Sequence, residues 1–180
     1  MGRRRTATLD ALLAYKNEEV VARFCKQWST SRAEGRRIFT DLMRFLWLTG
    51  STNEHLSPVW VVDEMWHMFL VYTRDYARFC SRYFGHMIHH GPTTLAERRA
   101  WREQARRSLP RARAKATKDL TRQVGLVLDH LGERVMLRWY VAYAAKYDAR
   151  FFRRAFRPGD DGGATPKFSP DLKRRARLTG

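Results

Sequence analysis

Residues 59–84, VWVVDEMWHMFLVYTRDYARFCSRYF, decide the fold of this chain. Their apolar residues recur every three or four positions, which is the spacing of one face of an α-helix and not the alternation of a half-buried strand. The stripe comprises Trp66, Phe69, Leu70, Thr73, Ala77, Cys80 and Phe84. Ser57-Pro58 before the stretch is typical of a helix start, and Gly85 after it is typical of a helix end. We therefore expect a helical segment with one buried face.

The same helical spacing continues towards the N-terminus. Asn17, which precedes two glutamates, is a predicted helix cap. Ser31 with Glu34 three residues later has the form of a capping box, in which each side chain satisfies a backbone amide at the helix start. Gly50 is predicted to end the helix that Ser31 opens. These residues predict further helices before the central stretch.

Helical spacing also continues towards the C-terminus. Residues 94–109 are thin in apolar positions and predict a surface helix, residues 108–132 predict a second helix, and residues 136–151 predict a third. The second is expected to bury Leu120, Val124, Val127, Leu128 and Leu131. From Pro158 onward the periodicity stops. The sequence thus predicts an all-α, compact bundle of about six helices in one domain, 1–157, followed by a flexible basic tail, 158–180.

Composition limits the class of protein. The chain has 180 residues, 44% of them hydrophobic, which is enough for one domain with a buried core. It has two cysteines and no apolar run after Met1, so we expect reduced thiols and a cytoplasmic location. The most apolar stretch, 59–72, contains charged residues and is shorter than the ~20 residues of a membrane span. We therefore expect no membrane partner.

The charge is strongly positive. There are 35 Lys and Arg residues against 18 Asp and Glu residues, a formal net charge of +17. The region 98–122 carries ten basic and two acidic residues, with Trp101 interleaved. The candidate polyanion-binding residues are Arg98, Arg99, Arg102, Arg106, Arg107, Arg111 and Arg113. Such a region predicts contacts to phosphates of a nucleic acid, or to an acidic protein partner. Composition bias of the source genome explains the same arginines without any partner.

Histidines gather in the segment 63–90, which holds four of the six in the chain. Asp63 and His67 are four residues apart, so a helix places them on one face, where they can bind one cation or form a hydrogen-bonded pair. His89 and His90 follow at the end of the segment. The candidate ligands of a divalent metal ion, zinc or iron, are Asp63, His67, His89 and His90, with Cys80 and His86 ranked below them.

A break in the helix decides whether these residues can meet. An unbroken helix from His67 to Cys80 advances about 20 Å, and the residues after it are too few to bring the histidine pair back. Thr73, with Asp75 in the following turn, has the chemistry of a helix cap and would supply the break. Without a break the ligands must come from another helix; Asp129, His130 and His55 are candidates by residue type alone.

Structural roles compete with the metal hypothesis for each residue. His67 can be an imidazole paired with Asp63 inside the fold, Cys80 can be a core thiol, and the histidine pair can be a solvated turn or a helix-end cap. Asp63 or Glu64 with His67 has the groups for acid–base chemistry. The sequence contains no nucleophile elbow, phosphate-binding glycine loop or two-cysteine zinc knuckle, and it leaves open whether the protein is an enzyme.

The motif D-x-x-W-H, then Y-x-x-F-C, then F-G-x-x-x-H-H-x-P resembles the bacterial members of the glycine-rich domain-containing protein-like family. The matching residues are Asp63, Trp66, His67, Tyr76, Phe79, Cys80, Phe84, Gly85, His89, His90 and Pro92. The resemblance covers roughly thirty residues, and the aromatic run 139–152 shows a weaker similarity to the family. It implies a helical domain and no particular reaction. The chain lacks the glycine-rich extension of the longer members, so a role tied to that extension is not implied.

Overall fold

The described part of the chain is entirely helical. The computed structural model describes residues 7–52, 54, 56–91 and 94–157, and within them there is no strand. In chain order the helices are α1 (Leu9–Leu13), α2 (Glu18–Trp28), α3 (Arg32–Thr52), α4 (Trp60–Val71), α5 (Thr73–Phe84), α6 (Leu95–Arg107), α7 (Leu109–Leu131), α8 (Glu133–Leu137), the π-helix η1 (Arg138–Tyr143), α9 (Ala144–Lys146) and α10 (Ala149–Ala155). The predicted all-α class is confirmed. The predicted tail, 158–180, lies outside the described residues.

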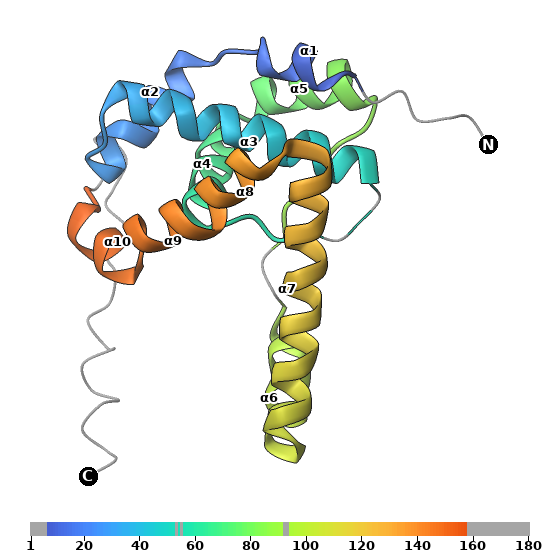
Figure 1. The fold of residues 1–180 in the computed structure, drawn as a ribbon. Coiled ribbons are helices and arrows are strands. Elements are labelled where there is room, and N and C mark those ends of the chain that lie inside the picture. The colour runs from blue at the N-terminus through green and yellow to red at the C-terminus, as the bar shows by residue number, and fades with distance from the viewer. Residues whose placement is uncertain (1–6, 53, 55, 92–93, 158–180) are drawn as a thin grey trace.

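Helix α3 is the centre of the body, and α1, α2, α4 and α7 pack against it (Figure 1). Ile38, Leu42 and Leu46 follow one another at four-residue spacing and are fully buried. This spacing places them on one face of the helix, where they contribute to the hydrophobic core. No helix among the described residues combines the length and apolar composition needed to cross a membrane.

One carboxylate is fully buried in this core and joins α3 to η1. Asp41 is 0% exposed. Its carboxylate accepts hydrogen bonds from Arg44 Nη1, Arg138 Nε and Arg138 Nη2, each at 2.7 Å, and from Tyr143 Oη at 2.8 Å. Hydrogen bonding to Asp41 raises the pKa of Arg138, so the guanidinium stays charged. Two partly buried guanidinium groups, those of Arg44 and Arg138, therefore compensate the buried negative charge of Asp41.

Of the two helix starts predicted before α4, one is confirmed and the other is confirmed in part. Asn17 caps α2, and its side chain accepts the amide of Val20 at 3.1 Å. The Ser31 half of the predicted capping box also forms, with Ser31 Oγ accepting the amide of Glu34 at 3.2 Å. The Glu34 carboxylate contacts Lys146 Nζ instead, at 2.8 Å. A tertiary ion pair has therefore replaced the local half of the box.

Gly50 does not end α3, which continues to Thr52, so that prediction is wrong. A Cβ atom on Gly50 would lie 2.6 Å from Cε1 of Phe84. The glycine therefore allows α3 and the end of α5 to approach closely, which is a packing role that the helix-end interpretation missed.

The break between α4 and α5 lies one residue from its predicted place. Tyr72, with φ −85° and ψ 62°, separates the two helices, and Thr73 is the first residue of α5 and not its cap. Helix α4 begins at Trp60 with Val59 as its cap, so the cap predicted at Ser57-Pro58 is also wrong. Gly85 ends α5 as predicted, with φ 72° in the left-handed region that favours glycine.

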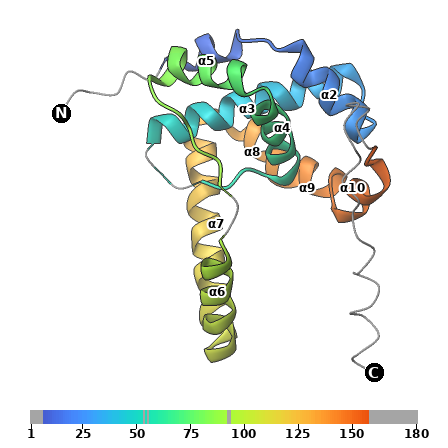
Figure 2. The ribbon, with the colours of Figure 1, turned by 180° about the vertical axis from the view of Figure 1, so that it is seen from behind.

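Helices α6 and α7 form an antiparallel hairpin that projects away from the body (Figures 1 and 2). Both starts have local causes: Thr94 and Glu97 form a complete capping box, and Ser108 caps α7. Helix α6 contains no buried residue. The predicted burial of Leu120 and Leu128 is wrong, since they are 52% and 42% exposed, whereas Val127 is buried. The hairpin presents its apolar positions to solvent because it leaves the core.

Candidate metal centre

Helix α4 supplies two of the three donor groups. Asp63 lies in its first turn and His67 one turn later, so both side chains project from the same face, as the spacing predicts. The distance from His67 Nε2 to Asp63 Oδ2 is 4.0 Å. The His67 side chain is 44% exposed and that of Asp63 is 27% exposed. The pair therefore lies at the surface of the body and not in its core.

A hydrogen-bond chain brings the segment after α5 back to α4. The indole Nε1 of Trp66 donates to Tyr76 Oη at 3.1 Å, and Tyr76 Oη donates to the carbonyl of Ile88 at 2.6 Å. The ring of His90 lies against Trp66, with ring centroids 4.3 Å apart. Tyr76 thus links α4, α5 and the returning segment, and this linkage places His90 beside the α4 pair.

Asp63, His67 and His90 form a group of potential metal ligands. Among the described residues it is the one group of three or more His, Cys, Asp or Glu residues whose ligand atoms converge. Their donor atoms all lie within 4.8 Å of one another. His90 Nε2 lies 2.8 Å from His67 Nε2 and 3.3 Å from Asp63 Oδ1. Ligands of a tetrahedral ion with bonds of about 2.0 Å are about 3.3 Å apart, so the two imidazoles would separate by about 0.5 Å to admit an ion. At 2.8 Å they share one proton in a hydrogen bond.

Electrostatics keep His90 in the form that binds metal. Burial lowers its pKa and the neighbouring His67 lowers it further, while Asp63 opposes both effects. The ring is therefore neutral at pH 7, which is the state in which a histidine nitrogen can coordinate an ion.

Glu64 lies on the other side of His67. Its Oε1 atom is 3.9 Å from His67 Nδ1, the ring nitrogen that faces away from His90. Burial raises the pKa of Glu64. At 3.9 Å the carboxyl group is outside hydrogen-bond reach of Nδ1. A shift of about 1 Å would let it accept the Nδ1 proton and so favour the tautomer that leaves Nε2 free, as carboxylates do around metal sites. The sequence predicts only an acid–base role for Glu64.

The structure leaves the other candidates apart from this group. His89 is exposed and does not belong to the group, although it is the neighbour of His90. His86 Nδ1 contacts the carbonyl of Phe84 at 2.9 Å. Cys80 is fully buried, and burial raises its pKa, as for a core thiol. His130 lies edge-on to Trp47, away from the group, and His55 lies outside the described residues.

The candidate polyanion-binding residues all lie on the projecting hairpin. Arg98, Arg99, Arg102, Arg106 and Arg107 belong to α6, and Arg111 and Arg113 belong to α7. All seven are exposed. The structure therefore separates the metal candidates on the body from the basic candidates on the hairpin.

Tyr76→Phe tests the linkage that places His90. The change removes one hydroxyl and leaves two buried partners, Trp66 Nε1 and the Ile88 carbonyl, without their hydrogen bond. We expect the free energy of unfolding to fall by about 1–3 kcal/mol, measured by urea denaturation. Tyr140→Phe is the control. Its half-buried hydroxyl accepts one hydrogen bond, from Gln123, so its loss should lower the free energy of unfolding by less. Equal losses in the two variants would contradict a special role for Tyr76.

A protein-family model described as UCP032817-like matches residues 7–126. The matched residues include Asp63, His67 and His90 and extend into α7. No curated protein and no solved structure matches the chain.

Proposed function

The chain belongs to the UCP032817-like family, whose description states no reaction, and from the geometry of the site we propose that Asp63, His67 and His90 bind one divalent metal ion. One observation carries the proposal: donor atoms from two segments that are 23 residues apart converge within 4.8 Å. Three converging donor atoms match the three protein ligands of a catalytic zinc site.

The donor set favours zinc or iron. Two imidazoles and one carboxylate occur around catalytic zinc and around non-haem Fe(II), whereas calcium and magnesium prefer oxygen ligands alone. Three protein ligands leave at least one coordination position for water. Because His67 is nearly half exposed, that position would face solvent. The ion would supply Lewis acidity or a bound hydroxide to a substrate that reaches the surface.

The competing hypothesis is that the three side chains form a hydrogen-bonded cluster that attaches the returning segment to α4. The 2.8 Å contact between the imidazoles suits that role. The two hypotheses differ in a measurable way, because a structural cluster has no stoichiometric affinity for a transition metal.

Metal titration of untagged protein tests the proposal. We expect isothermal titration with zinc to give one ion per chain, and we expect Co²⁺ to produce visible absorption bands typical of a nitrogen and oxygen ligand set. Bound zinc should also raise the thermal unfolding midpoint, since it binds the folded state. A stoichiometry near zero, with an unchanged midpoint in excess zinc, would contradict metal binding.

We also propose that the chain is a relative of the glycine-rich domain-containing protein-like family, on the motif described above. The contacts of the motif residues support this proposal. Asp63, His67 and His90 meet, Trp66 and Tyr76 are hydrogen-bonded, and Gly85 ends α5. A sequence alignment that retained the three ligands across both families would test it, and systematic loss of His67 or His90 would contradict it.

A further inference from the structure

The α6–α7 hairpin, residues 95–131, is attached to the body at one end only (Figures 1 and 2). Near that end, Gln123 exchanges two hydrogen bonds with the backbone of Ser57, at 2.8 and 2.7 Å, and Arg122 pairs with Glu54. Beyond it, the two helices lie side by side and project into solvent. Ala112 and Val127 are the buried residues of α7, and α6 has none. Burial of apolar surface therefore contributes little to the stability of the outer part of the hairpin.

The hairpin carries an excess of unpaired positive charge. Of the ten basic residues between Arg98 and Arg122, three form ion pairs: Arg107 with Glu103, Lys115 with Asp119, and Arg122 with Glu54. The seven others have no ion-pair partner within the part of the chain that the structure describes. They are Arg98, Arg99, Arg102, Arg106, Arg111, Arg113 and Lys118, and all of them are exposed.

Three of these arginines follow one another along a single face of α6. Arg98, Arg102 and Arg106 are four residues apart, which separates them by about 6 Å along the helix axis. Like charges at this spacing repel and destabilise the helix. A hairpin with little core and repelling charges gains stability from a negatively charged partner, which argues against a second copy of this chain as the occupant.

Trp101 lies among these arginines and is 57% exposed. An exposed indole beside basic side chains is the arrangement by which proteins stack on nucleic-acid bases while contacting the phosphates. In a duplex the faces of the bases are covered by their neighbours, whereas a single strand leaves them available. Trp101 therefore favours a single-stranded partner over a duplex.

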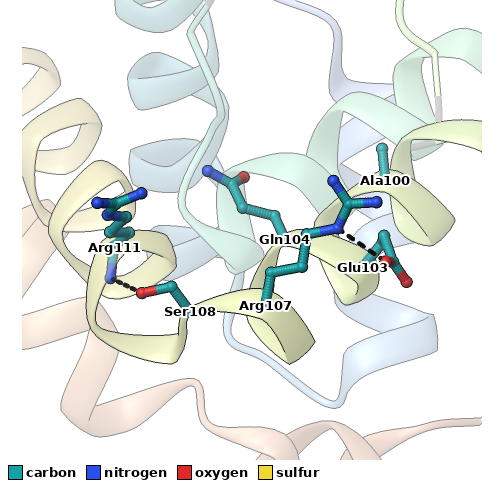
Figure 3. A pocket seen from close by; sticks show the side chains of 6 residues that line it. All are labelled: Ala100, Glu103, Gln104, Arg107, Ser108 and Arg111. Carbon is teal, nitrogen blue, oxygen red and sulfur yellow. Dashed lines mark hydrogen bonds and ion pairs between the residues drawn. The ribbon is translucent and has the colours of Figure 1, made fainter.

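A hollow of about 460 Å³ lies at the turn of the hairpin (Figure 3). It is lined by Ala100, Glu103, Gln104, Arg107, Ser108 and Arg111. Glu103 accepts a hydrogen bond from Arg107 Nε at 2.9 Å, whereas no carboxylate within the described ranges pairs with Arg111. The hollow extends the basic surface around the turn from α6 to α7.

We propose that the α6–α7 hairpin binds single-stranded nucleic acid, with the α6 arginines and Arg111 contacting phosphates and Trp101 stacking on a base. This site is separate from the metal centre and does not depend on it. An acidic protein surface satisfies the charge of the hairpin but gives Trp101 no base to stack on.

Fluorescence anisotropy with a short labelled oligothymidylate tests the proposal on the full chain. We expect the affinity to fall at least about tenfold between about 50 mM and about 200 mM salt, because three or more phosphate contacts release that many counterions. We expect Arg98→Gln, Arg102→Gln and Arg106→Gln together to weaken binding at least about tenfold. Glutamine is a good helix former, so this variant should keep its helical circular dichroism.

The matched control removes three positive charges from the body, as Arg74→Gln, Arg150→Gln and Arg153→Gln, all exposed in the structure. It should change the affinity by no more than about twofold, because these arginines lie on α5 and α10 and not on the hairpin. Its net charge equals that of the hairpin variant, so the two variants differ only in where the charge is removed. An equal loss in the two triple variants would show that net charge alone drives binding and would overturn the proposal.

Trp101→Ala separates a single strand from other polyanions. We expect it to weaken oligothymidylate binding about tenfold and to leave binding to a duplex of equal length nearly unchanged. The wild-type protein should bind the single strand more tightly than polyglutamate at equal salt. Unchanged oligothymidylate binding by Trp101→Ala would overturn the proposal. Polyglutamate that binds as tightly as the oligonucleotide would also overturn it and would indicate an acidic protein partner.

Discussion

Replacing Asp41 with alanine is expected to lower the free energy of unfolding by about 3–5 kcal/mol, because it leaves the partly buried guanidinium groups of Arg44 and Arg138 without their counter-charge and the buried Tyr143 hydroxyl without its acceptor. The carboxylate is fully buried and accepts four hydrogen bonds from three side chains, Arg44, Arg138 and Tyr143. Removing it would leave two guanidinium groups close together without their counter-charge. Urea denaturation followed by circular dichroism measures the loss.

Asp41→Asn is the second variant in this series. It keeps the shape and one acceptor oxygen but removes the charge, so we expect a loss that is smaller than for Asp41→Ala and still large. Asp119→Ala is the control, because this carboxylate pairs with Lys115 on the exposed face of α7. It should leave the urea midpoint nearly unchanged. Similar midpoints for Asp41→Ala and Asp119→Ala would contradict the role assigned to the buried carboxylate.

Replacing His90 with alanine is expected to weaken zinc binding by about a hundredfold or more, whereas His89→Ala should change it by no more than about twofold. The two histidines are adjacent in the sequence, but only His90 directs a ring nitrogen towards His67 and Asp63. Competition with a chromophoric zinc chelator measures both affinities. Equal losses for the two variants would show that this ligand set is wrong.

His67→Ala separates a loss of metal binding from a loss of folding. The His90 ring packs on Trp66, so its removal has a packing cost of its own, whereas the His67 ring is nearly half exposed. We expect His67→Ala to lose zinc affinity as His90→Ala does, and to keep its unfolding midpoint in the absence of metal. A normal zinc affinity in this variant would contradict the site.

Part of the candidate metal centre was predictable from local spacing. Asp63 and His67 share a helical face because they are four residues apart, and the need for a break near Thr73 follows from the length of a helix. The choice of His90 over His89 was not predictable. It depends on the path of residues 86–91, which have no periodicity and are held by the bond from Tyr76 to the Ile88 carbonyl.

The Asp41 network was not anticipated, although a weak signal exists. Asp41 is a charged residue within the apolar face of α3, between Ile38 and Leu42. An acidic residue in that position needs a buried counter-charge. Its main partner, Arg138, is 97 residues away in the sequence, so no local pattern could identify it.

The all-α class follows from the sequence alone, because helical periodicity and helix caps depend on residues within one or two turns of each other. Asn17, Thr94 and Ser108 cap their helices, and Gly85 and Gly132 lie at helix ends. Each of these roles depends on the type of one residue and can be predicted from it. Only the tertiary structure decided which histidine joins Asp63 and His67, and that α6 and α7 leave the core with Leu120 and Leu128 exposed. Both outcomes depend on contacts between segments distant in sequence, whose geometry is set by the packing of the whole chain.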